Sequence, residues 1–574
     1  MQQMTNSTTT QKASRTVDLL VIGAGPAGMA ATIFAKMKGL DVLLVEKTDQ
    51  VGGTAATSAG TLWIPENSQG KAIGDKDSIA EASSYLADLI AIHTPRTDRQ
   101  RAAYMESGVE AIDFLHNNTD VKFLPCGEHP DYHAKPGAAI RGRAIVPAPF
   151  DGRVLGKEFE RVRPPIKEFM VFGGMMVGKM DIPRLIGRYR SISNFIYSAG
   201  LFLRYLTDRL RYSRGTRLVM GNALVGRMYH TLLQLGVRPQ FNTSLDRLIY
   251  ENGRVTGASL NGPNGREIIA ARRGVILATG GFAHNKAYRE RLMPKPTPQF
   301  SLANAANQGE GVTAAEALGA RINEQENGNG GFWTPVSVTK RADGSQGLFP
   351  HLSLDRAKPG VIAVNQDGKR FCNEADSYHD FVEAMYRSGD GKAIPAWLVC
   401  NRDFIRKYGL GNIYPGTTNL RRFVQDGYLV EANSPEELAA RIGVDAKALR
   451  ATLERYNEQA ARGVDEDFHR GHSALNRFNG DPTVKPNPCV APIALRDLCA
   501  VQVWPAEIAC SAGISTDEDG RVVDMDEHPI PGLYACGNDM ASIMGDSYPG
   551  PGTTLGPAVV FAWRAVKNAL GNAH

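Results

Sequence analysis

Cysteine is scarce in this sequence, and no two cysteines stand in the C-x-x-C spacing of a zinc or redox site. The seven that occur among 574 residues form an odd, scattered set. Such a set is typical of reduced thiols in a cytosolic protein and not of a disulfide-stapled secreted domain. No apolar run reaches the roughly 18 residues that a membrane-spanning helix needs. We therefore expect a cytoplasmic protein with no integral membrane segment and no metal site.

A strong charge of either sign is also lacking. The formal net charge of +5 is too small for this length to indicate a nucleic-acid partner. Residues 1–16 are rich in Thr, Ser and Gln and have no apolar stretch like that of a signal peptide, so we expect a disordered tail. The chain exceeds the usual size of one hydrophobic core, which predicts two or more domains.

What the sequence does have is a dense glycine motif near its amino end. Residues 17–22 are apolar apart from Asp18, as in a buried parallel strand, and a helical stretch begins at Met29. Between them, G-x-G-x-x-G spacing permits a tight turn, close approach of the backbone to a pyrophosphate, and close packing of the helix. The residues of this turn are Gly23, Gly25, Ala27 and Gly28.

Two later segments repeat the pattern of a strand that ends in a glycine turn, at residues 274–282 and 530–539. Glu46 ends the strand that follows the first turn, where a carboxylate accepts hydrogen bonds from ribose hydroxyls. Three such turns around one nucleotide fold resemble the two-dinucleotide-binding flavoproteins, which bind FAD. The residues expected to contact FAD, beyond the first turn, are Glu46, Lys47, Gly52, Gly53, Thr54, Thr57, Ser58, Ala278, Thr279, Gly280, Gly537, Asn538, Thr554 and Leu555.

These elements predict an α/β protein with a Rossmann-type FAD-binding domain and an inserted α+β catalytic domain. Residues 17–300 and 495–574 would form the FAD-binding domain, and residues 301–494 the catalytic domain. A final helix at 557–570 would place its positive amino end near the flavin. An insertion at about 159–227 interrupts the first part.

Within this insertion, residues 182–217 combine an apolar helical face with positive charge. Between residues 186 and 217 there are seven arginines and one aspartate. A basic amphipathic helix can lie in a bilayer interface, but the pattern also fits a core helix or a subunit contact. The sequence leaves these interpretations open. The apolar positions, at three- and four-residue spacings, are Ile192, Phe195, Ile196, Ala199, Leu203, Leu206 and Leu210.

The stretch 364–374, which ends in Asn373-Glu374, resembles a motif of the fumarate reductase and 3-ketosteroid dehydrogenase superfamily. The fumarate-reducing branch carries an arginine four residues after the glutamate, where this chain has Tyr378. The chain instead resembles the 3-ketosteroid Δ1-dehydrogenases, which have a tyrosine there and Tyr-Pro-Gly-x-Gly near the end, here residues 548–552. Asp131-Tyr132, ahead of a Pro-Phe-Asp-Gly loop, matches a third part of that pattern.

The resemblance implies a catalytic set. The Tyr548 hydroxyl and the Gly552 amide would hold a ketone oxygen, and Tyr378 would remove the proton from the adjacent carbon. Tyr132 would hydrogen-bond Tyr378 and help it to ionise, with Tyr197 as an alternative for that role. Hydride would pass to the flavin.

The expected substrate is a hydrophobic 3-ketosteroid and the expected electron acceptor a quinone-type or artificial oxidant. A smaller cyclic ketone of the cyclohexanone type is the close alternative. An ene-reductase of the fumarate reductase kind is a second class, and a non-enzymatic flavin-bound protein is a third.

Relatives with a covalently linked flavin use a histidine in the segment after the first glycine turn. Residues 51–60 contain none, so we predict noncovalent FAD. Acid precipitation of the purified protein should therefore release all yellow colour into the supernatant. Colour that stays in the pellet would contradict the prediction.

Overall fold

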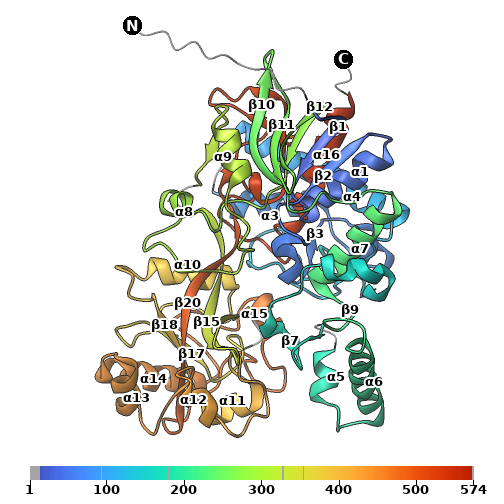
Figure 1. Ribbon diagram of the computed structural model, residues 1–574. Coiled ribbons are helices and arrows are strands. Elements are labelled where there is room, and N and C mark those ends of the chain that lie inside the picture. The colour runs from blue at the N-terminus through green and yellow to red at the C-terminus, as the bar shows by residue number, and fades with distance from the viewer. Residues whose placement is uncertain (1–12, 92, 179–180, 326–328, 353–354, 572–574) are drawn as a thin grey trace.

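The computed structural model describes residues 13–91, 93–178, 181–325, 329–352 and 355–571. Two seven-stranded sheets organise these residues, one in the upper half of Figure 1 and one in the lower half. The first sheet has the order β10-β11-β12-β1-β2, with β23 paired to β12 and β22 to β23. The second has the order β16-β15-β20-β18-β17, with β13 and β19 also paired to β20.

The centre of the first sheet is β1 (Arg15–Ile22), which lies parallel between β2 (Val42–Val45) and β12 (Gly265–Leu277). Residues 19–22 are buried on both faces, which explains their continuous apolar run. The strand already begins at Arg15, which pairs with Ile269, so the tail ends earlier than expected. Residues 1–12 lie outside the described part of the chain.

A β-hairpin extends this sheet, formed by β10 (Ser244–Glu251) and β11 (Arg254–Gly262). Its two turn residues, Asn252 and Gly253, have φ of 51° and 78°, the left-handed values that a two-residue hairpin turn requires. The carboxyl end of β12 pairs in parallel with β23 (Pro529–Ala535), so the late glycine turn returns to the first sheet.

Helices α1 (Pro26–Met37) and α16 (Leu555–Gly571) pack against each other and against this sheet. The turn before α1 leaves no room for side chains at two of its glycines. Gly23 has φ of 105°, and a Cβ at Gly28 would lie 1.9 Å from the Gly23 carbonyl oxygen. A Cβ at Gly25, by contrast, would meet no protein atom within 4 Å.

The second sheet is built around the long strand β20 (Leu498–Cys510), which pairs with β15 (Gly331–Lys340) and β18 (Ala396–Asn401). The expected boundary at residue 495 therefore differs from the sheet topology, because the chain returns to the first sheet only after β20. The remaining strands of this sheet are β13 (Phe300–Ser301), β16 (Gln346–Pro350), β17 (Ile362–Val364) and β19 (Val430–Ala432).

Shorter elements surround the two sheets. The helices are α2 (Ser68–Ala72), α3 (Ile79–Leu89), α4 (Pro95–Asn118), α7 (Met220–Gln234), α8 (Lys286–Leu292), α9 (Glu310–Glu316), α10 (Tyr378–Arg387), α11 (Arg402–Tyr408), α12 (Arg421–Gln425), α13 (Pro435–Ile442), α14 (Ala446–Ala461) and α15 (Ala474–Asn479). The 3-10 turns are η1 (Gly53–Thr57), η2 (Gly152–Arg161), η3 (Lys167–Phe169) and η5 (Gly537–Asp539). The short strands are β3 (Leu62–Trp63), β4 (Phe123–Pro125), β5 (Ala144–Pro147), β6 (Phe150–Asp151), β7 (Met170–Val171), β8 (Met175–Met176), β9 (Arg217–Leu218), β14 (Ile322–Asn323), β21 (Gly513–Ile514) and β22 (Arg521–Val523).

The insertion forms a helical pair, α5 (Ile182–Ile186) and α6 (Ile192–Asp208), which projects from the rest of the chain at the lower right of Figure 1. Tyr205 and Asp208 attach α6 to the body and are its buried residues. Its predicted apolar face points to solvent, with Ile192 79% and Ile196 64% exposed. The core-helix interpretation is therefore wrong for this chain. Among the described helices, none has the length and apolar character needed to cross a bilayer.

The glycine turn yields a matched pair of variants. Gly25→Ala should keep the thermal stability of the apoprotein, because the added methyl group meets open space, yet lower FAD affinity about tenfold or more by crowding the pyrophosphate. Gly28→Ala should lower stability itself, because its methyl group collides with the Gly23 carbonyl. Thermal melts and FAD titrations of both apoproteins test this, and equal loss of stability in the two would contradict it.

Candidate active site

Three tyrosines from distant segments meet between the two sheets. Tyr132 lies in the loop between β4 and β5, Tyr378 is the first residue of α10, and Tyr548 precedes α16. The Tyr132 hydroxyl donates to the Tyr378 hydroxyl at 3.3 Å. The ring of Tyr548 lies 5.4 Å from that of Tyr378 and 5.7 Å from that of Tyr132, between centroids. The structure thus brings together all three predicted tyrosines.

Backbone contacts hold the loops of Tyr132 and Tyr548 against each other. The Tyr132 amide donates to the Pro549 carbonyl at 2.8 Å. The preceding residue, Asp131, is buried and accepts hydrogen bonds from the Trp63 indole at 2.7 Å and the Arg143 guanidinium at 2.6 Å. A buried carboxylate with these partners fixes the direction of its neighbour Tyr132.

Tyr197, the alternative to Tyr132, lies elsewhere. Its hydroxyl donates to Asp181 at the base of the α5–α6 pair. Arg217 donates to the same carboxylate at 2.8 Å, so this group is committed to holding the insertion together. The structure favours Tyr132 as the neighbour of Tyr378.

The helix start at Tyr378 follows from local sequence. The Ser377 hydroxyl caps α10 by accepting from the Asp380 amide at 3.1 Å. This places Tyr378 in the first turn, where the unpaired amides carry partial positive charge. Removal from water raises the pKa of Tyr378 and Tyr548 well above the ordinary value of a phenol. Both are therefore neutral near pH 7 until a reaction draws the proton away.

Gly552 occupies a position that only glycine fits. Its φ is 100°, and a Cβ there would lie 2.5 Å from the Leu62 carbonyl carbon. The Gly552 carbonyl accepts from the Trp63 amide at 3.3 Å. Within the described residues its own amide donates to no protein group, which leaves that donor for a ligand.

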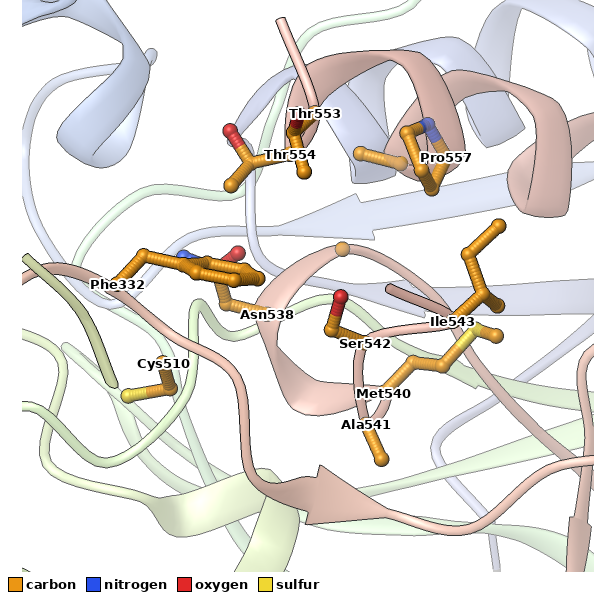
Figure 2. A pocket seen from close by; sticks show the side chains of 12 residues that line it. Phe332, Cys510, Asn538, Met540, Ala541, Ser542, Ile543, Thr553, Thr554 and Pro557 are labelled. Carbon is orange, nitrogen blue, oxygen red and sulfur yellow. The ribbon is translucent and has the colours of Figure 1, made fainter. Parts of the chain in front are cut away.

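A small cavity lies at the amino end of α16 (Figure 2). The Phe332 ring forms one wall and packs edge-on against Tyr548 with centroids 5.1 Å apart. Of the predicted FAD contacts, Gly537, Asn538 and Thr554 line this cavity, whereas Leu555 does not. Pro557 and Ala558, from the first turns of α16, line it as well, as expected for the final helix.

The dinucleotide turn fits a phosphate. Gly25 caps α1 without any side-chain hydrogen bond, so the helix amides at this end point at open space. Glu46 stands at the end of β2, where its carboxylate accepts from the amides of Ala24 and Thr48, both at 2.9 Å. Lys47 pairs with Glu310. These residues surround the place where the motif predicts the pyrophosphate and ribose.

The other predicted contacts form the walls of the same region. Gly52, Gly53, Thr54, Thr57 and Ser58 lie in or beside η1. Thr54 accepts from the Asn304 amide at 2.9 Å, which joins η1 to the second half of the chain. Ala278, Thr279 and Gly280 follow β12, where the Thr279 hydroxyl donates to Asp539 at 2.8 Å. Together these groups form a cradle of backbone amides and small side chains that suits FAD.

Sequence reasoning missed two residues of this site. Asp539 is fully buried and ties the glycine turns after β12 and β23 together through Thr279 and Gly281. Its position at the end of Cys-Gly-Asn-Asp was the available signal. Phe332 joins the cavity to Tyr548, but nothing in its local sequence distinguishes it from other strand residues.

The structure offers one loose group of metal-ligand types among the described residues, Asp524, Asp526 and His528 between β22 and β23. The Asp524 carboxylate accepts from the amides of the other two at 2.9 Å, which is the geometry of an ordinary turn. This group therefore does not alter the prediction of no metal site.

Comparison with known proteins agrees with this geometry. The model of the FAD binding domain family matches residues 18–555. The chain is 38% identical to 4-oxocyclohex-2-ene-1-carboxylate 5-dehydrogenase of Sinomonas cyclohexanicum, over 97% of this chain and 94% of that protein. It is 35% identical to 3-oxosteroid 1-dehydrogenase of Mycolicibacterium smegmatis, over 97% of both chains.

Among solved structures, the 3-ketosteroid delta1-dehydrogenase of Sterolibacterium denitrificans in complex with 1,4-androstadiene-3,17-dione superimposes with a TM-score of 0.89. It shares 35% identity, and the match covers 98% of this chain and 100% of that one. A flavocytochrome c3 fumarate reductase, 21% identical with a TM-score of 0.62, shares the fold. The chain belongs to the family of FAD-binding flavoprotein dehydrogenases that includes the 3-oxosteroid 1-dehydrogenases.

Proposed function

We propose that this enzyme introduces a double bond next to a ring ketone, most specifically the 1,2-desaturation of a 3-ketosteroid. The observation that carries the proposal is the meeting of Tyr132, Tyr378 and Tyr548 beside the FAD cavity. The relatives named for steroid desaturation and the similar structure with a bound steroid support it.

Two donors would hold the ketone. The Tyr548 hydroxyl and the Gly552 amide come from the same loop, and both would donate to the ketone oxygen. Negative charge builds on that oxygen as the adjacent C–H bond breaks, and preorganised donors stabilise it without rearrangement. Burial of Tyr548 keeps its phenol protonated, and therefore a donor, near pH 7.

Tyr378 would take the proton from the carbon next to the ketone. Its hydroxyl receives a hydrogen bond from Tyr132 at 3.3 Å, and this bond strengthens when the acceptor becomes a phenolate. FAD, when bound, supplies the acceptor for the hydride that leaves the neighbouring carbon. Proton and hydride together account for the two hydrogens lost from the substrate.

A smaller ring ketone is a second candidate, because the 38% identical relative is named for a cyclohexene carboxylate. Such a substrate carries a carboxylate that calls for a cationic partner.

The flavin half-reaction separates the base from the ketone donors. Tyr378→Phe should slow flavin reduction by about 10²-fold or more, because it removes the group that takes the proton. Substrate binding should remain, since Tyr548 and Gly552 are intact. Tyr548→Phe should weaken binding and rate together. Anaerobic stopped-flow measurement with androst-4-ene-3,17-dione and with cyclohexanone checks both variants.

The wild-type rate should rise with pH, because Tyr378 acts as a base and removal from water raises its pKa. Tyr132→Phe should move that rise to higher pH by removing a donor to the phenolate. Near-normal reduction by Tyr378→Phe with every ketone would place the base elsewhere.

We further propose that the α5–α6 pair contacts the membrane surface, where a hydrophobic steroid and a quinone-type acceptor accumulate. The outward side of α6 is a continuous apolar face, with Leu203 61% and Phe195 54% exposed. An exposed face of this kind is unfavourable in water and suits the headgroup boundary of a bilayer.

The arginines of this segment divide into two groups. Arg204 pairs with Asp151, Arg217 pairs with Asp181, and Arg214 is buried, so these three hold the insertion to the body. The four that remain of the seven lie exposed near the two ends of α6 and suit anionic headgroups. They are Arg188, Arg190, Arg209 and Arg211.

The exposed face supplies a test that leaves the attachment intact. Ile196→Asp with Leu203→Asp should abolish co-sedimentation with phosphatidylglycerol vesicles, because charge cannot enter the interface. Ile196→Leu with Leu203→Ile keeps the same two positions apolar, so it is the matched control and should bind vesicles. Unchanged vesicle binding of the double variant would mean that another surface meets the membrane, and the apolar face of α6 would then be left for a subunit contact.

A further inference from the structure

A buried arginine lies directly behind the helix that carries Tyr378. Arg356 precedes β17 and is 1% exposed. Its guanidinium donates to backbone carbonyls on two sides: to His351 at 2.8 Å and Leu352 at 2.6 Å, and to Glu374 at 2.7 Å. Two of its nitrogens also lie 3.4 Å from the Asp376 carbonyl. Arg356 therefore clamps the turn that leads into α10.

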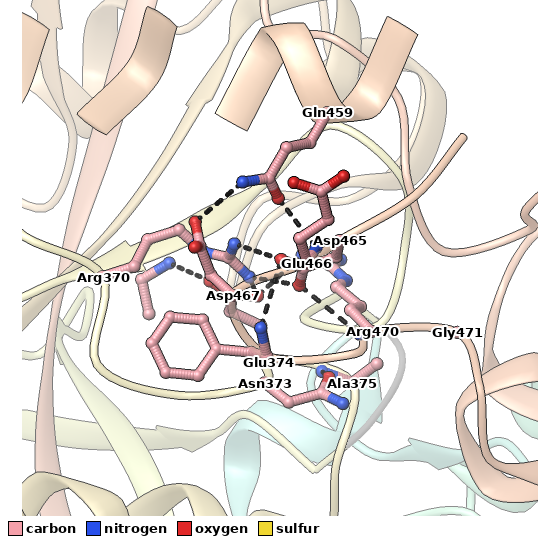
Figure 3. A network of polar contacts seen from close by, with 12 residues as sticks. Arg370, Asn373, Glu374, Ala375, Gln459, Asp465, Glu466, Asp467, Arg470 and Gly471 are labelled. Carbon is pink, nitrogen blue, oxygen red and sulfur yellow. Dashed lines mark hydrogen bonds and ion pairs between the residues drawn. The ribbon is translucent and has the colours of Figure 1, made fainter. Parts of the chain in front are cut away.

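The neighbouring buried arginines behave differently. Arg370 and Arg470 both pair with the Glu374 carboxylate, and Arg370 also pairs with Asp465 (Figure 3). The positive charges of these two are balanced by carboxylates at 2.8 to 3.0 Å. Arg356 makes no ion pair within 4.0 Å among the described residues. Burial lowers the pKa of its guanidinium, and the adjacent Asp355 carboxylate, which accepts from the Arg356 backbone amide at 2.8 Å, raises it.

A buried cation loses its hydration, and for Arg356 the backbone carbonyls and the neighbouring Asp355 carboxylate offset part of that loss. Its surroundings show what the charge faces. The guanidinium packs on the Phe381 ring of α10 at 4.9 Å. Removal from water is the largest influence on Tyr378 and raises its pKa, whereas the Arg356 charge lowers that pKa by a smaller amount. A phenolate at Tyr378 would add a second negative charge near the guanidinium.

Other titratable groups also lie around Tyr378. Burial lowers the pKa of the next residue, His379, but the Glu383 carboxylate at 3.2 Å outweighs burial and leaves that pKa raised, so the positive charge of His379 is paired with Glu383. Tyr132 and Tyr548 are phenols, and Asp376 and Asp380 are acids on either side of Tyr378 in the chain. Burial raises the pKa of the Asp376 carboxyl to about 7, so it adds negative charge mainly above that pH. His133 lies 3.7 Å from Asp380, beside that acid.

We propose that Arg356 is the positioning residue of the base: it fixes the turn that sets Tyr378 against Tyr132, and its charge stabilises the phenolate that forms when Tyr378 ionises. This rests on the proposed role of Tyr378. Only an arginine can both hold the turn and supply this charge, because its planar guanidinium donates to carbonyls on two sides and carries a delocalised positive charge.

The test follows flavin reduction in the holoenzyme by anaerobic stopped-flow, from about pH 6 to 10, for wild type and variants. Arg356→Gln should slow reduction at pH 7 by about 10²-fold and move the rise of the rate upward by about one pH unit or more. Arg356→Lys keeps the positive charge, so its flavin reduction rate should increase over the same pH range as that of the wild type. The rate itself should fall about tenfold.

Arg470→Gln is the matched control, since it removes a charge of equal burial that does not reach the Asp376 carbonyl. It should lower thermal stability but leave unchanged the pH at which the flavin reduction rate increases. If Arg470→Gln shifts the pH of this increase as much as Arg356→Gln does, the role assigned to Arg356 is overturned. The role is also overturned if Arg356→Gln lowers the rate equally at every pH.

If Arg356→Gln yields no folded protein, Arg356→Lys decides, and a wild-type rate in that variant overturns the positioning role. The outcome is separable from the proposed function. Failure of any ketone to reduce the wild-type flavin, or normal reduction by Tyr378→Phe, would remove the proposed base itself. If ketones reduce the wild-type flavin and Arg356→Gln keeps the wild-type pH dependence of the rate, only the role of Arg356 is removed and the proposed function stands.

Discussion

The arrangement of the site depends on the hydrogen bonds that tie the Tyr132 loop to the Tyr548 loop. The Tyr132 amide donates to the Pro549 carbonyl at 2.8 Å, and the Tyr85 hydroxyl donates to the same carbonyl at 2.6 Å. One buried oxygen thus accepts from two segments that lie more than four hundred residues away in sequence. Because a buried carbonyl holds its donors at fixed distances, the two phenols keep one relative position.

Tyr378 reaches this pair from the second sheet, so its placement depends on a separate set of buried polar contacts. Glu374 pairs with Arg370 and Arg470, and its carboxylate also accepts the Ala363 amide from β17 at 3.0 Å. These contacts join the turn before α10 to the strands beneath it. The proposed base and the proposed ketone donors therefore come from segments attached to two different sheets.

The insertion shows how one basic, apolar segment can serve two purposes. Its inward side is polar and specific, with Asp208 accepting from the Thr216 amide and hydroxyl at 2.8 Å. Its outward side is apolar and makes no such contacts. The inward side explains how a projecting helical pair stays attached, and the outward side leaves a surface for a partner.

The sequence by itself determined the local features. The strand of residues 17–22, the glycine turn and the Asn252–Gly253 hairpin were predictable, because each depends on backbone conformations that neighbouring residues dictate. The tyrosines were found through motif resemblance. Tertiary structure alone decided that β20 belongs to the second sheet, that Asp539 joins two glycine turns, and that Arg356 packs behind the helix that carries Tyr378. The apolar face of α6 was visible in sequence, but its exposure was not, since burial depends on what packs against a helix. These are long-range pairings, and the physical reason they escape sequence reasoning is that their partners lie far apart in the chain.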